Sequence, residues 1–271
     1  MRFFAMGLAA VAILCAACGT KDKKADGDNS LREPRVLVLF ASTSLSESAH
    51  ELAENFESMH PGVTVTVALD ATNTLIKRLA AGESADLFAF VGKQELDAAV
   101  KSGLITADRE RVFARNKIML VVSKDNTANI RTIKDLGRPG LKVAVAGQDV
   151  PIGKFSMECL SYLDNDLSFG IGFRSRVLKN VVSQEGDVRT VLNKVMKKEA
   201  DVGIVYISDL RGRDADSIIG IEIPDEYNVR AEYYIAPLLK SSQSDLNDAF
   251  IDLIFSNTGR TILMKRGFFL D

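Results

Sequence analysis

Near the beginning of the chain, a short apolar run from Val36 to Phe40 is followed by small hydroxyl residues and then by a helical pattern. An unbroken apolar run of this length is typical of a β-strand that is buried on both faces of a sheet. The apolar residues from Leu45 to Phe56 recur at helical spacing. Ser44 and Glu47 form an S-x-x-E pattern, which predicts a capping box with Ser44 as the N-cap residue.

The same succession of strand, polar turn and helix start recurs three more times along the chain. The later turns are Asp70–Thr74, Gly147–Gly153 with Pro151 suited to a first helical turn, and the turn that ends at Asp187, a predicted N-cap. Each helix start offers free backbone N–H groups and the positive end of a helix dipole. Several of these starts in one place would favour the binding of an anion.

Strands that alternate with helices predict an α/β fold in which parallel strands are joined by right-handed crossovers. The pattern begins again at the strand that starts with Lys117, which predicts a second lobe. A late strand, Glu232–Leu239, predicts that the chain crosses back, so that the last helices pack on the first lobe. We therefore expect two lobes, each with a mixed, mainly parallel sheet flanked by helices, and a ligand cleft between them. The predicted lobes are residues 35–116 with 238–271, and residues 117–237.

The first residues have the pattern of a secretory signal. Arg2 is followed by an apolar segment, and small residues then precede Cys18. Cys18 with the residues around it looks like the lipidation site of a bacterial lipoprotein. The sequence thus predicts a signal peptide at 1–18, a solvated tether at 19–34 and a protein anchored to a membrane, outside the cytoplasm, through Cys18.

Composition and missing motifs exclude several classes of function. The chain has 271 residues and a net charge of −2, without the basic excess typical of nucleic-acid binding. It contains no phosphate-binding loop, H-E-x-x-H or G-x-S-x-G motif, and no catalysis, protein-held metal or cofactor is expected. An enzyme with Ser44 as nucleophile remains an alternative, but it needs a general base, and neither His50 nor His60 is placed by the sequence to serve.

The predicted cleft contains mostly neutral donors. Lys154 and Arg189 are the only cations close to the tips of these turns. Neutral donors and helix dipoles could therefore hold a dianion. A site with few acceptors also disfavours a protonated anion, since an unpaired buried O–H costs about 1–3 kcal/mol.

A series of motifs occurs in one order along the chain: F-A-S-T-S-L at 40–45, T-L-I-K-R-L at 74–79, G-E-S-A-D-L-F at 82–88, V-P-I-G at 150–153, D-V-R at 187–189, G-I-V-Y at 203–206 and R-G-F at 266–268. In order and spacing this series resembles the molybdate-binding receptors of bacterial ABC importers, which are two-lobed periplasmic solute-binding proteins of type II. The resemblance covers about residues 35–269.

The resemblance implies a tetrahedral oxyanion, molybdate or tungstate, that is held by hydroxyls and backbone amides. Carried over by position, Ser44 offers its hydroxyl and amide, and Thr72 stands where the family has serine. Ile152, where alanine is usual, and Val188 offer backbone amides, and Tyr206 offers its phenol. The metal is then bound only as part of the oxyanion.

The resemblance also implies partners and a motion. The receptor is expected to act as a monomer, to close its lobes on the anion by a hinge and to deliver the anion to an ABC permease. Asp70 departs from the family pattern, and we expect it to point away and cap the helix that follows. Sulfate, phosphate or an organic acid remain alternative ligands, and an Asp70 that faced the cleft would favour phosphate.

Overall fold

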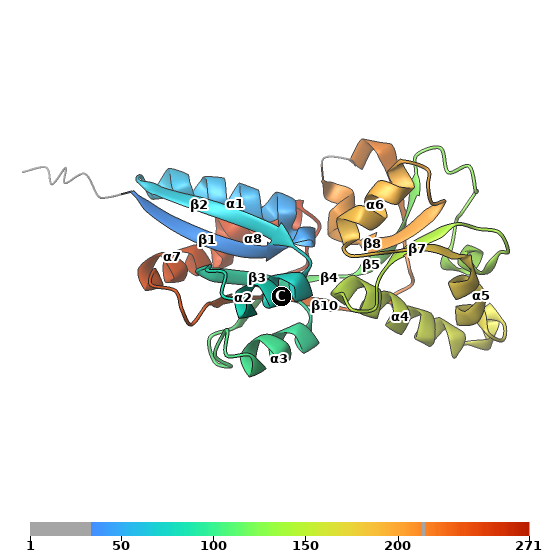
Figure 1. Cartoon of the computed structure of the whole chain (residues 1–271). Coiled ribbons are helices and arrows are strands. Elements are labelled where there is room, and N and C mark those ends of the chain that lie inside the picture. The colour runs from blue at the N-terminus through green and yellow to red at the C-terminus, as the bar shows by residue number, and fades with distance from the viewer. Residues whose placement is uncertain (1–33, 213–214, 271) are drawn as a thin grey trace, which may run out of the picture. The chain divides into compact units, whose positions relative to one another are not determined.

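The computed structural model describes residues 34–212 and 215–270, and the part from Pro34 onward forms one compact unit. Its strands form two sheets, and the helices pack on both (Figure 1). The predicted signal peptide, most of the predicted tether and Cys18 lie outside the described residues. Within the described residues no helix is long and apolar enough to cross a membrane.

The first sheet has the strand order β2-β1-β3-β10-β4, in which β1, β2 and β3 are parallel and β10 is antiparallel to its neighbours. Its strands are β1 (Arg35–Ser42), β2 (Val63–Asp70), β3 (Leu87–Val91), β4 (Arg111–Asn116) and β10 (Ala231–Pro237). Its helices are α1 (Ser46–Met59), α2 (Thr72–Ala80), α3 (Lys93–Lys101), α7 (Ser244–Phe255) and α8 (Asn257–Lys265).

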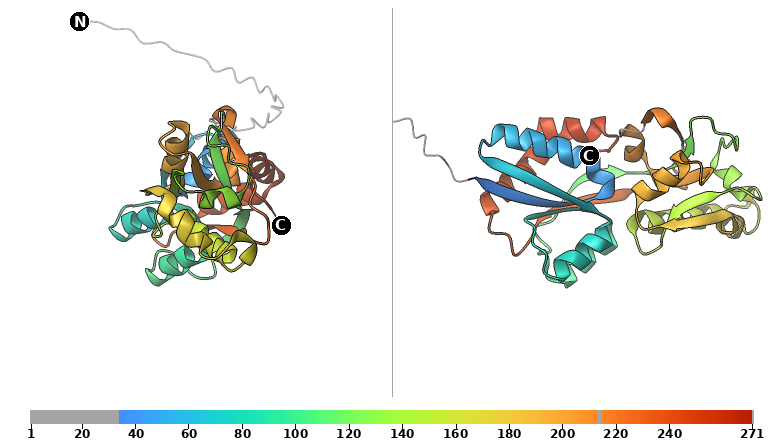
Figure 2. Two further views of the ribbon diagram at one scale, coloured as in Figure 1. Left: turned by 90° about the vertical axis from the view of Figure 1, so that its right-hand side faces the viewer. Right: turned by 45° about the horizontal axis from the view of Figure 1, so that its top comes forward.

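Helices cover both faces of this sheet because the side chains of its strands alternate between two apolar layers. Leu37 and Leu39 of β1 pack in the layer that contains Phe56 of α1, whereas Phe40 packs in the layer that contains Leu75 of α2. Figure 1 and Figure 2 show α1, α7 and α8 on one face and α2 and α3 on the other.

The second sheet has the order β7-β6-β8-β5-β9, with β6 parallel to both of its neighbours and β5 antiparallel to both of its own. Its strands are β5 (Ile118–Ser123), β6 (Val143–Ala146), β7 (Val181–Glu185), β8 (Val202–Tyr206) and β9 (Ile218–Ile221). Its α-helices are α4 (Pro151–Asp164), α5 (Phe173–Asn180) and α6 (Val188–Met196). Short 3₁₀ helices complete the fold: η1 (Thr43–Leu45), η2 (Ile133–Gly137), η3 (Leu167–Phe169), η4 (Ile207–Arg211) and η5 (Ala215–Ser217).

The expected α/β architecture with two mixed sheets is confirmed, and α7 and α8 return to the first lobe by packing on α1. One predicted boundary is wrong. The range 117–237 assigns β10 to the second lobe, but β10 pairs with β3 and β4 of the first sheet. Its apolar residues predict a buried strand in either sheet, and the choice between sheets depends on pairing over a long sequence separation. The chain therefore passes between the lobes at Lys117 and again within 222–230.

Candidate functional site

A small pocket lies between the two lobes, where the ends of strands from both sheets meet the starts of helices. Its free space, the open mouth included, is about 260 Å³, which is below the range of pockets for drug-sized ligands. The first lobe lines it with Ser42, Thr43, Ser44, Ala71, Thr72 and Val91, and the second with Val150, Pro151, Ile152, Asp187, Val188 and Tyr206. The five residues expected at an oxyanion site are all among them.

Hydroxyl side chains line the first lobe's side of the pocket. Ser42 Oγ and Thr72 Oγ1 lie 2.6 Å apart and share one hydrogen bond, and the backbone N–H of Val91 approaches Thr72 Oγ1 at 3.5 Å. Both hydroxyl side chains are buried. Because the two hydroxyls share a single hydrogen bond, one of their two protons remains available to the pocket.

The predicted capping box at Ser44 is wrong. Ser44 lies within η1, and α1 begins only at Ser46, with Leu45 as an N-cap that makes no side-chain hydrogen bond. A 3₁₀ turn separates the strand from the helix, which displaces the cap from the position that the S-x-x-E pattern indicates. Ser44 Oγ instead accepts a hydrogen bond from the phenol of Tyr233 at 3.0 Å.

The second lobe presents the first turns of two helices. The predicted N-cap at Asp187 is confirmed, since its carboxylate accepts from the N–H of Thr190 at 2.9 Å, and Pro151 occupies the first turn of α4. The side chains of Ile152 and Val188 are each only 3% exposed, within the apolar core. Their N–H groups are in first helical turns, which lack intrahelical acceptors, and so can serve the pocket as donors.

Gly153 allows α4 to start where it does. A Cβ at this position would lie 1.8 Å from the carbonyl oxygen of Gly147 and 2.7 Å from that of Ala146. Real side chains cannot approach backbone this closely, so only glycine lets the helix start pack against the end of β6. The sequence V-P-I-G thus combines a proline suited to the first turn with a glycine that the packing requires.

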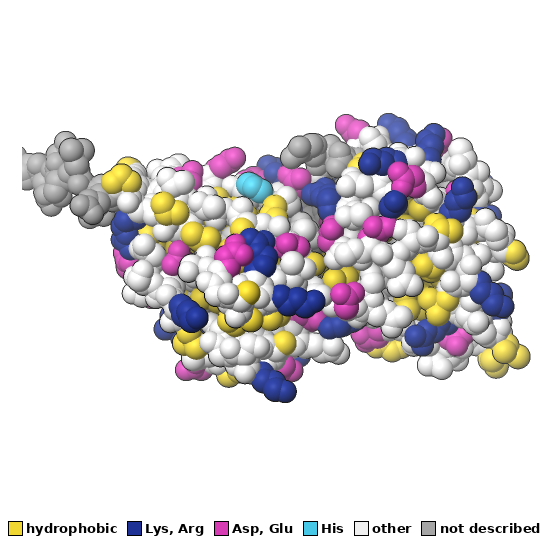
Figure 3. Space-filling model, in the orientation of Figure 1, with side chains coloured by type: hydrophobic (Ala, Val, Ile, Leu, Met, Phe, Trp, Pro, Cys, Tyr) yellow, Lys and Arg dark blue, Asp and Glu magenta, His cyan; other side chains and the backbone are white. Residues whose placement is uncertain are grey.

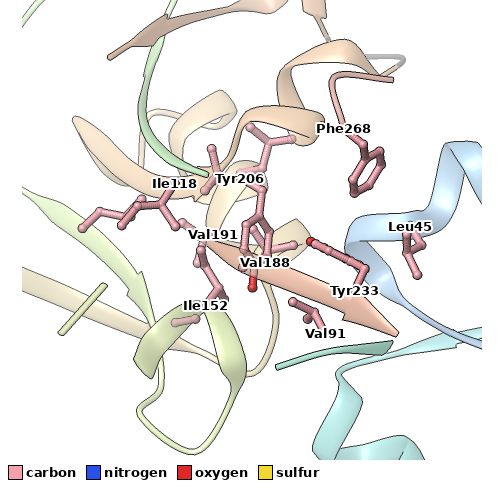
Figure 4. Close-up of a cluster of buried hydrophobic side chains, with 14 of the residues drawn as sticks. Leu45, Val91, Ile118, Ile152, Val188, Val191, Tyr206, Tyr233 and Phe268 are labelled. Atoms are coloured by element: carbon pink, nitrogen blue, oxygen red, sulfur yellow. The ribbon is translucent and has the colours of Figure 1, made fainter. Parts of the chain in front are cut away.

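Tyr206 brings a phenol to the pocket from the end of β8. The residue is 1% exposed and its hydroxyl has no hydrogen-bond partner among the described residues. Figure 4 shows the phenol oxygen of Tyr206 directed toward the region between Val91, Ile152 and Val188, and the phenol oxygen of Tyr233 directed toward Val188. Burial raises the pKa of Tyr206 well above its ordinary value, so the hydroxyl keeps its proton at neutral pH and is a donor.

No lysine or arginine lines the pocket. Asp187 does line it, but its carboxylate is occupied by the N–H and hydroxyl of Thr190. Asp70 is not a lining residue: it accepts from the N–H of Ala71 at 2.8 Å and lies 3.5 Å from Arg78, as expected of a residue that faces away. The expected cap is wrong, because the N-cap of α2 is Ala71 and no side chain caps this helix. Figure 3 shows acidic and basic side chains interspersed on the visible face, without a large patch of one sign. An anion in the pocket would therefore meet neutral donors.

Polar contacts join the lobes around the pocket, and sequence reasoning missed them. Lys154 of α4 pairs with the buried Glu95 of α3. Arg189 of α6 lies 3.4 Å from Glu47 of α1.

A third contact between the lobes is a hydrogen bond from Asn73 Nδ2 of α2 to the carbonyl oxygen of Asp149, at 2.8 Å. The two cations expected near the helix tips are thus engaged by carboxylates of the opposite lobe, and the described structure has its lobes joined.

A buried acid lies behind the site. Asp209 in η4 is 5% exposed and accepts from the N–H of Tyr206 at 2.9 Å. Burial raises its pKa from 3.8 to about 7, against the opposing effects of that N–H and of Arg189. Among the described residues no group of three His, Cys, Asp or Glu side chains could hold a metal ion.

Two sequence comparisons relate this chain to known proteins. Residues 37–269 match the family model of bacterial extracellular solute-binding proteins. The molybdate-binding protein ModA of Mycobacterium tuberculosis is 32% identical over 93% of this chain and 91% of its own. ModA of Escherichia coli is 27% identical over 89% and 91%. A sulfate-binding protein of Synechococcus elongatus is 21% identical over 96% of this chain and 79% of its own.

Solved structures share the fold. The molybdate-binding protein of Azotobacter vinelandii has a TM-score of 0.74 at 15% identity and covers 87% of this chain and 99% of its own. The sulfate-binding protein SubI of M. tuberculosis has a TM-score of 0.77 at 20% identity, with 86% of each chain covered. At these identities the structures show the fold alone. The family match and the mycobacterial relative together show that this chain belongs to the bacterial extracellular solute-binding proteins.

Proposed function

We propose that this protein is an extracytoplasmic receptor that binds molybdate or tungstate and delivers it to the permease of an ABC importer. The observation that carries this proposal is the pocket: an uncharged set of hydroxyl and amide donors that lies between the two lobes and is lined by no lysine or arginine. Fixed donors of this kind suit a fully ionised dianion. The two ModA relatives bear the name of molybdate-binding proteins.

In this proposal each predicted site residue has one role. Ser44 and Thr72 donate through their hydroxyls, Ile152 and Val188 through their backbone N–H groups, and Tyr206 through its phenol. The protein acts as a monomer, is anchored to a membrane through Cys18 and catalyses no reaction. The serine-enzyme alternative lacks support, since Nδ1 of His50 and Nδ1 of His60 each bond a carbonyl oxygen of α1, and no hydrogen bond joins either ring to Ser44 among the described residues.

Sulfate is the second candidate, because a sulfate-binding relative matches most of the chain and sulfate is also a tetrahedral dianion. Phosphate is less well supported. Hydrogen phosphate carries a proton that needs an acceptor, and Asp70, the acid proposed for that role, is not a lining residue.

Calorimetric titration of the compact unit 34–271 with molybdate, tungstate, sulfate and phosphate, in an anion-free organic buffer, tests the proposal. We expect saturable one-site binding of molybdate and tungstate, with far weaker binding of sulfate and phosphate. A protein that prefers sulfate would contradict the assignment of the anion. If the protein binds none of the four anions, the result would contradict the proposal that it is an oxyanion receptor.

A further inference from the structure

Tyr233 has a buried phenol beside the pocket and is not one of the five expected site residues. It lies on β10, is 0% exposed and donates its hydroxyl proton to Ser44 Oγ at 3.0 Å. Its ring meets those of Tyr206 and Phe268 edge to face, with ring centroids 6.0 Å and 5.1 Å away. This packing fixes the phenol while leaving it out of the pocket lining itself.

Asn116, also 0% exposed, is a second buried polar side chain and lies on β4, which pairs with β10. Its Oδ1 accepts from the N–H of Lys117 at 3.0 Å, and its Nδ2 donates to Ser208 Oγ at 2.8 Å. Both polar atoms of this amide are thus engaged by partners other than Tyr233. Among the described residues, Ser44 Oγ is the hydrogen-bond partner of the Tyr233 phenol.

The phenol of Tyr233 therefore has an assigned donor role. Its proton, which is buried and must find an acceptor, goes to Ser44. Ser44 Oγ then accepts from Tyr233, and no other described residue accepts the proton of Ser44. Ser44 lines the pocket, so this proton is free to point into it.

We propose that Tyr233 is a positioning residue that orients the hydroxyl of Ser44 as a donor toward the bound anion and thereby favours fully ionised oxyanions over protonated ones. The proposal rests on the proposed function and extends it to selectivity. Donation from Tyr233 polarises the Ser44 hydroxyl, which strengthens its bond to an anion. It also occupies one of the two lone pairs with which Ser44 could otherwise accept the proton of hydrogen phosphate.

Replacing Tyr233→Phe tests this role. In the variant the Ser44 hydroxyl is free to turn and to accept. We expect the affinity for molybdate to fall roughly three- to tenfold, the range for one hydrogen bond. The affinity for hydrogen phosphate at pH 8 should fall less or rise, so that the ratio of the two affinities narrows.

Tyr234→Phe is the matched control, because the neighbouring phenol on the same strand bonds Glu232 at 2.7 Å and does not contact Ser44. Calorimetry with molybdate, sulfate and phosphate should be repeated in a Ser44→Ala background. There Tyr233→Phe should change affinity by less than about twofold, since Tyr233 acts through Ser44. An equal loss in both backgrounds, or an unchanged ratio of molybdate to phosphate affinity, would overturn the proposal.

A neutron crystal structure of the wild-type molybdate complex gives a test that needs no variant. The deuteron of Tyr233 should lie toward Ser44 Oγ, and the deuteron of Ser44 toward the anion; the reverse orientation would refute the role. A wild-type protein that binds no anion would overturn the proposed function itself. Wild-type binding with an unaltered Tyr233→Phe variant would overturn only the role of Tyr233.

Discussion

The two lobes contribute to the pocket in different chemical ways. The first lobe presents side-chain hydroxyls from the ends of β1 and the start of α2. The second presents backbone N–H groups at the starts of α4 and α6, behind apolar side chains, together with the Tyr206 phenol. Side-chain truncation can therefore remove donors from the first lobe, whereas the second lobe's amides persist through most substitutions and depend on helix geometry.

The largest effect is expected from Gly153→Ala, which changes the position of the start of α4. The added Cβ would lie 1.8 Å from the carbonyl oxygen of Gly147, so the start of α4 must shift relative to the end of β6. We expect calorimetry to detect no molybdate binding, a loss above about 100-fold, because a misplaced helix start removes several donors at once. Gly186→Ala is the control, since a Cβ there meets nothing within 4 Å. Equal binding by both variants would refute the dependence on helix geometry.

The second lobe also has a predicted dependence on pH. The folded protein raises the pKa of Asp209 from 3.8 to about 7, so it binds a proton that the unfolded chain releases. Below pH 3.8 this contribution to the free energy of unfolding is complete. As the pH rises from 3.8 to about 7 the contribution is lost, by about 1.4 kcal/mol per pH unit.

Asp209→Asn should remove this dependence and stabilise the protein above neutral pH, while keeping an acceptor for the N–H of Tyr206. Denaturant unfolding of both proteins between pH 4 and 8 measures the difference. Asp216→Asn, at an exposed site, is the control. Parallel stability curves for wild type and Asp209→Asn would show that Asp209 ionises normally.

One of the two backbone N–H donors of the second lobe can be deleted at Val188, the first residue of α6. Asp187 before it has the extended conformation that proline tolerates, with φ −157° and ψ 167°, and proline is well suited to the first helical position. Val188→Pro replaces the donor with a methylene against the anion, and we expect an affinity loss of roughly 10- to 100-fold. Val188→Ala keeps the amide and should bind within a few-fold of wild type. If the two variants bind alike, the amide is not a ligand.

Tyr206→Phe removes the one side-chain donor that the second lobe contributes to the lining of the pocket. The affinity for molybdate should fall about tenfold, the lower end for a bond to a charged group. The stability of the ligand-free protein should stay the same or rise, because the lost hydroxyl is buried without a partner. Thermal unfolding and calorimetry measure the two effects, with the exposed Tyr162→Phe as control. Loss of stability without loss of affinity would make Tyr206 a core residue only.

The smallest effect is expected from Asn73→Ala, which removes a contact between the lobes without touching the donors. Asn73 Nδ2 donates to the carbonyl oxygen of Asp149 at an exposed site. The affinity should fall roughly two- to fivefold, mainly through faster dissociation, because the joined state loses one neutral hydrogen bond. Asn55→Ala is the control, since Asn55 bonds only within α1. Stopped-flow dissociation rates that match wild type would show that this contact does not hold the lobes together.

The sequence could predict features that depend on neighbours in the chain. Apolar runs, the Asp187 cap and the Pro151 helix start are local patterns, and the resemblance carried by the ordered motifs brought Ser44, Thr72, Ile152, Val188 and Tyr206 to one pocket. Features that depend on distant pairing were missed or misplaced. Tyr233 lies 189 positions from the serine it contacts, and β10 could have joined either sheet on its composition alone.

The contacts that join the lobes were missed for the same reason. Lys154 and Glu95 are 59 positions apart, and nothing in the local sequence of either residue indicates a partner in the other lobe. The capping box failed differently, because the short-range pattern at Ser44 is compatible with the 3₁₀ turn that actually precedes α1. Ser44 instead lines the pocket, where its hydroxyl oxygen accepts a hydrogen bond from Tyr233.

A crystal structure of residues 34–271 with molybdate, located by the anomalous scattering of molybdenum, tests the pocket most directly. We expect one anomalous peak between the lobes, with oxygens within about 3 Å of Ser44 Oγ, Thr72 Oγ1, the N–H groups of Ile152 and Val188, and the Tyr206 hydroxyl. No lysine or arginine should contact the anion. A peak elsewhere, or an anion held by a cationic side chain, would contradict the account of a pocket built from neutral donors.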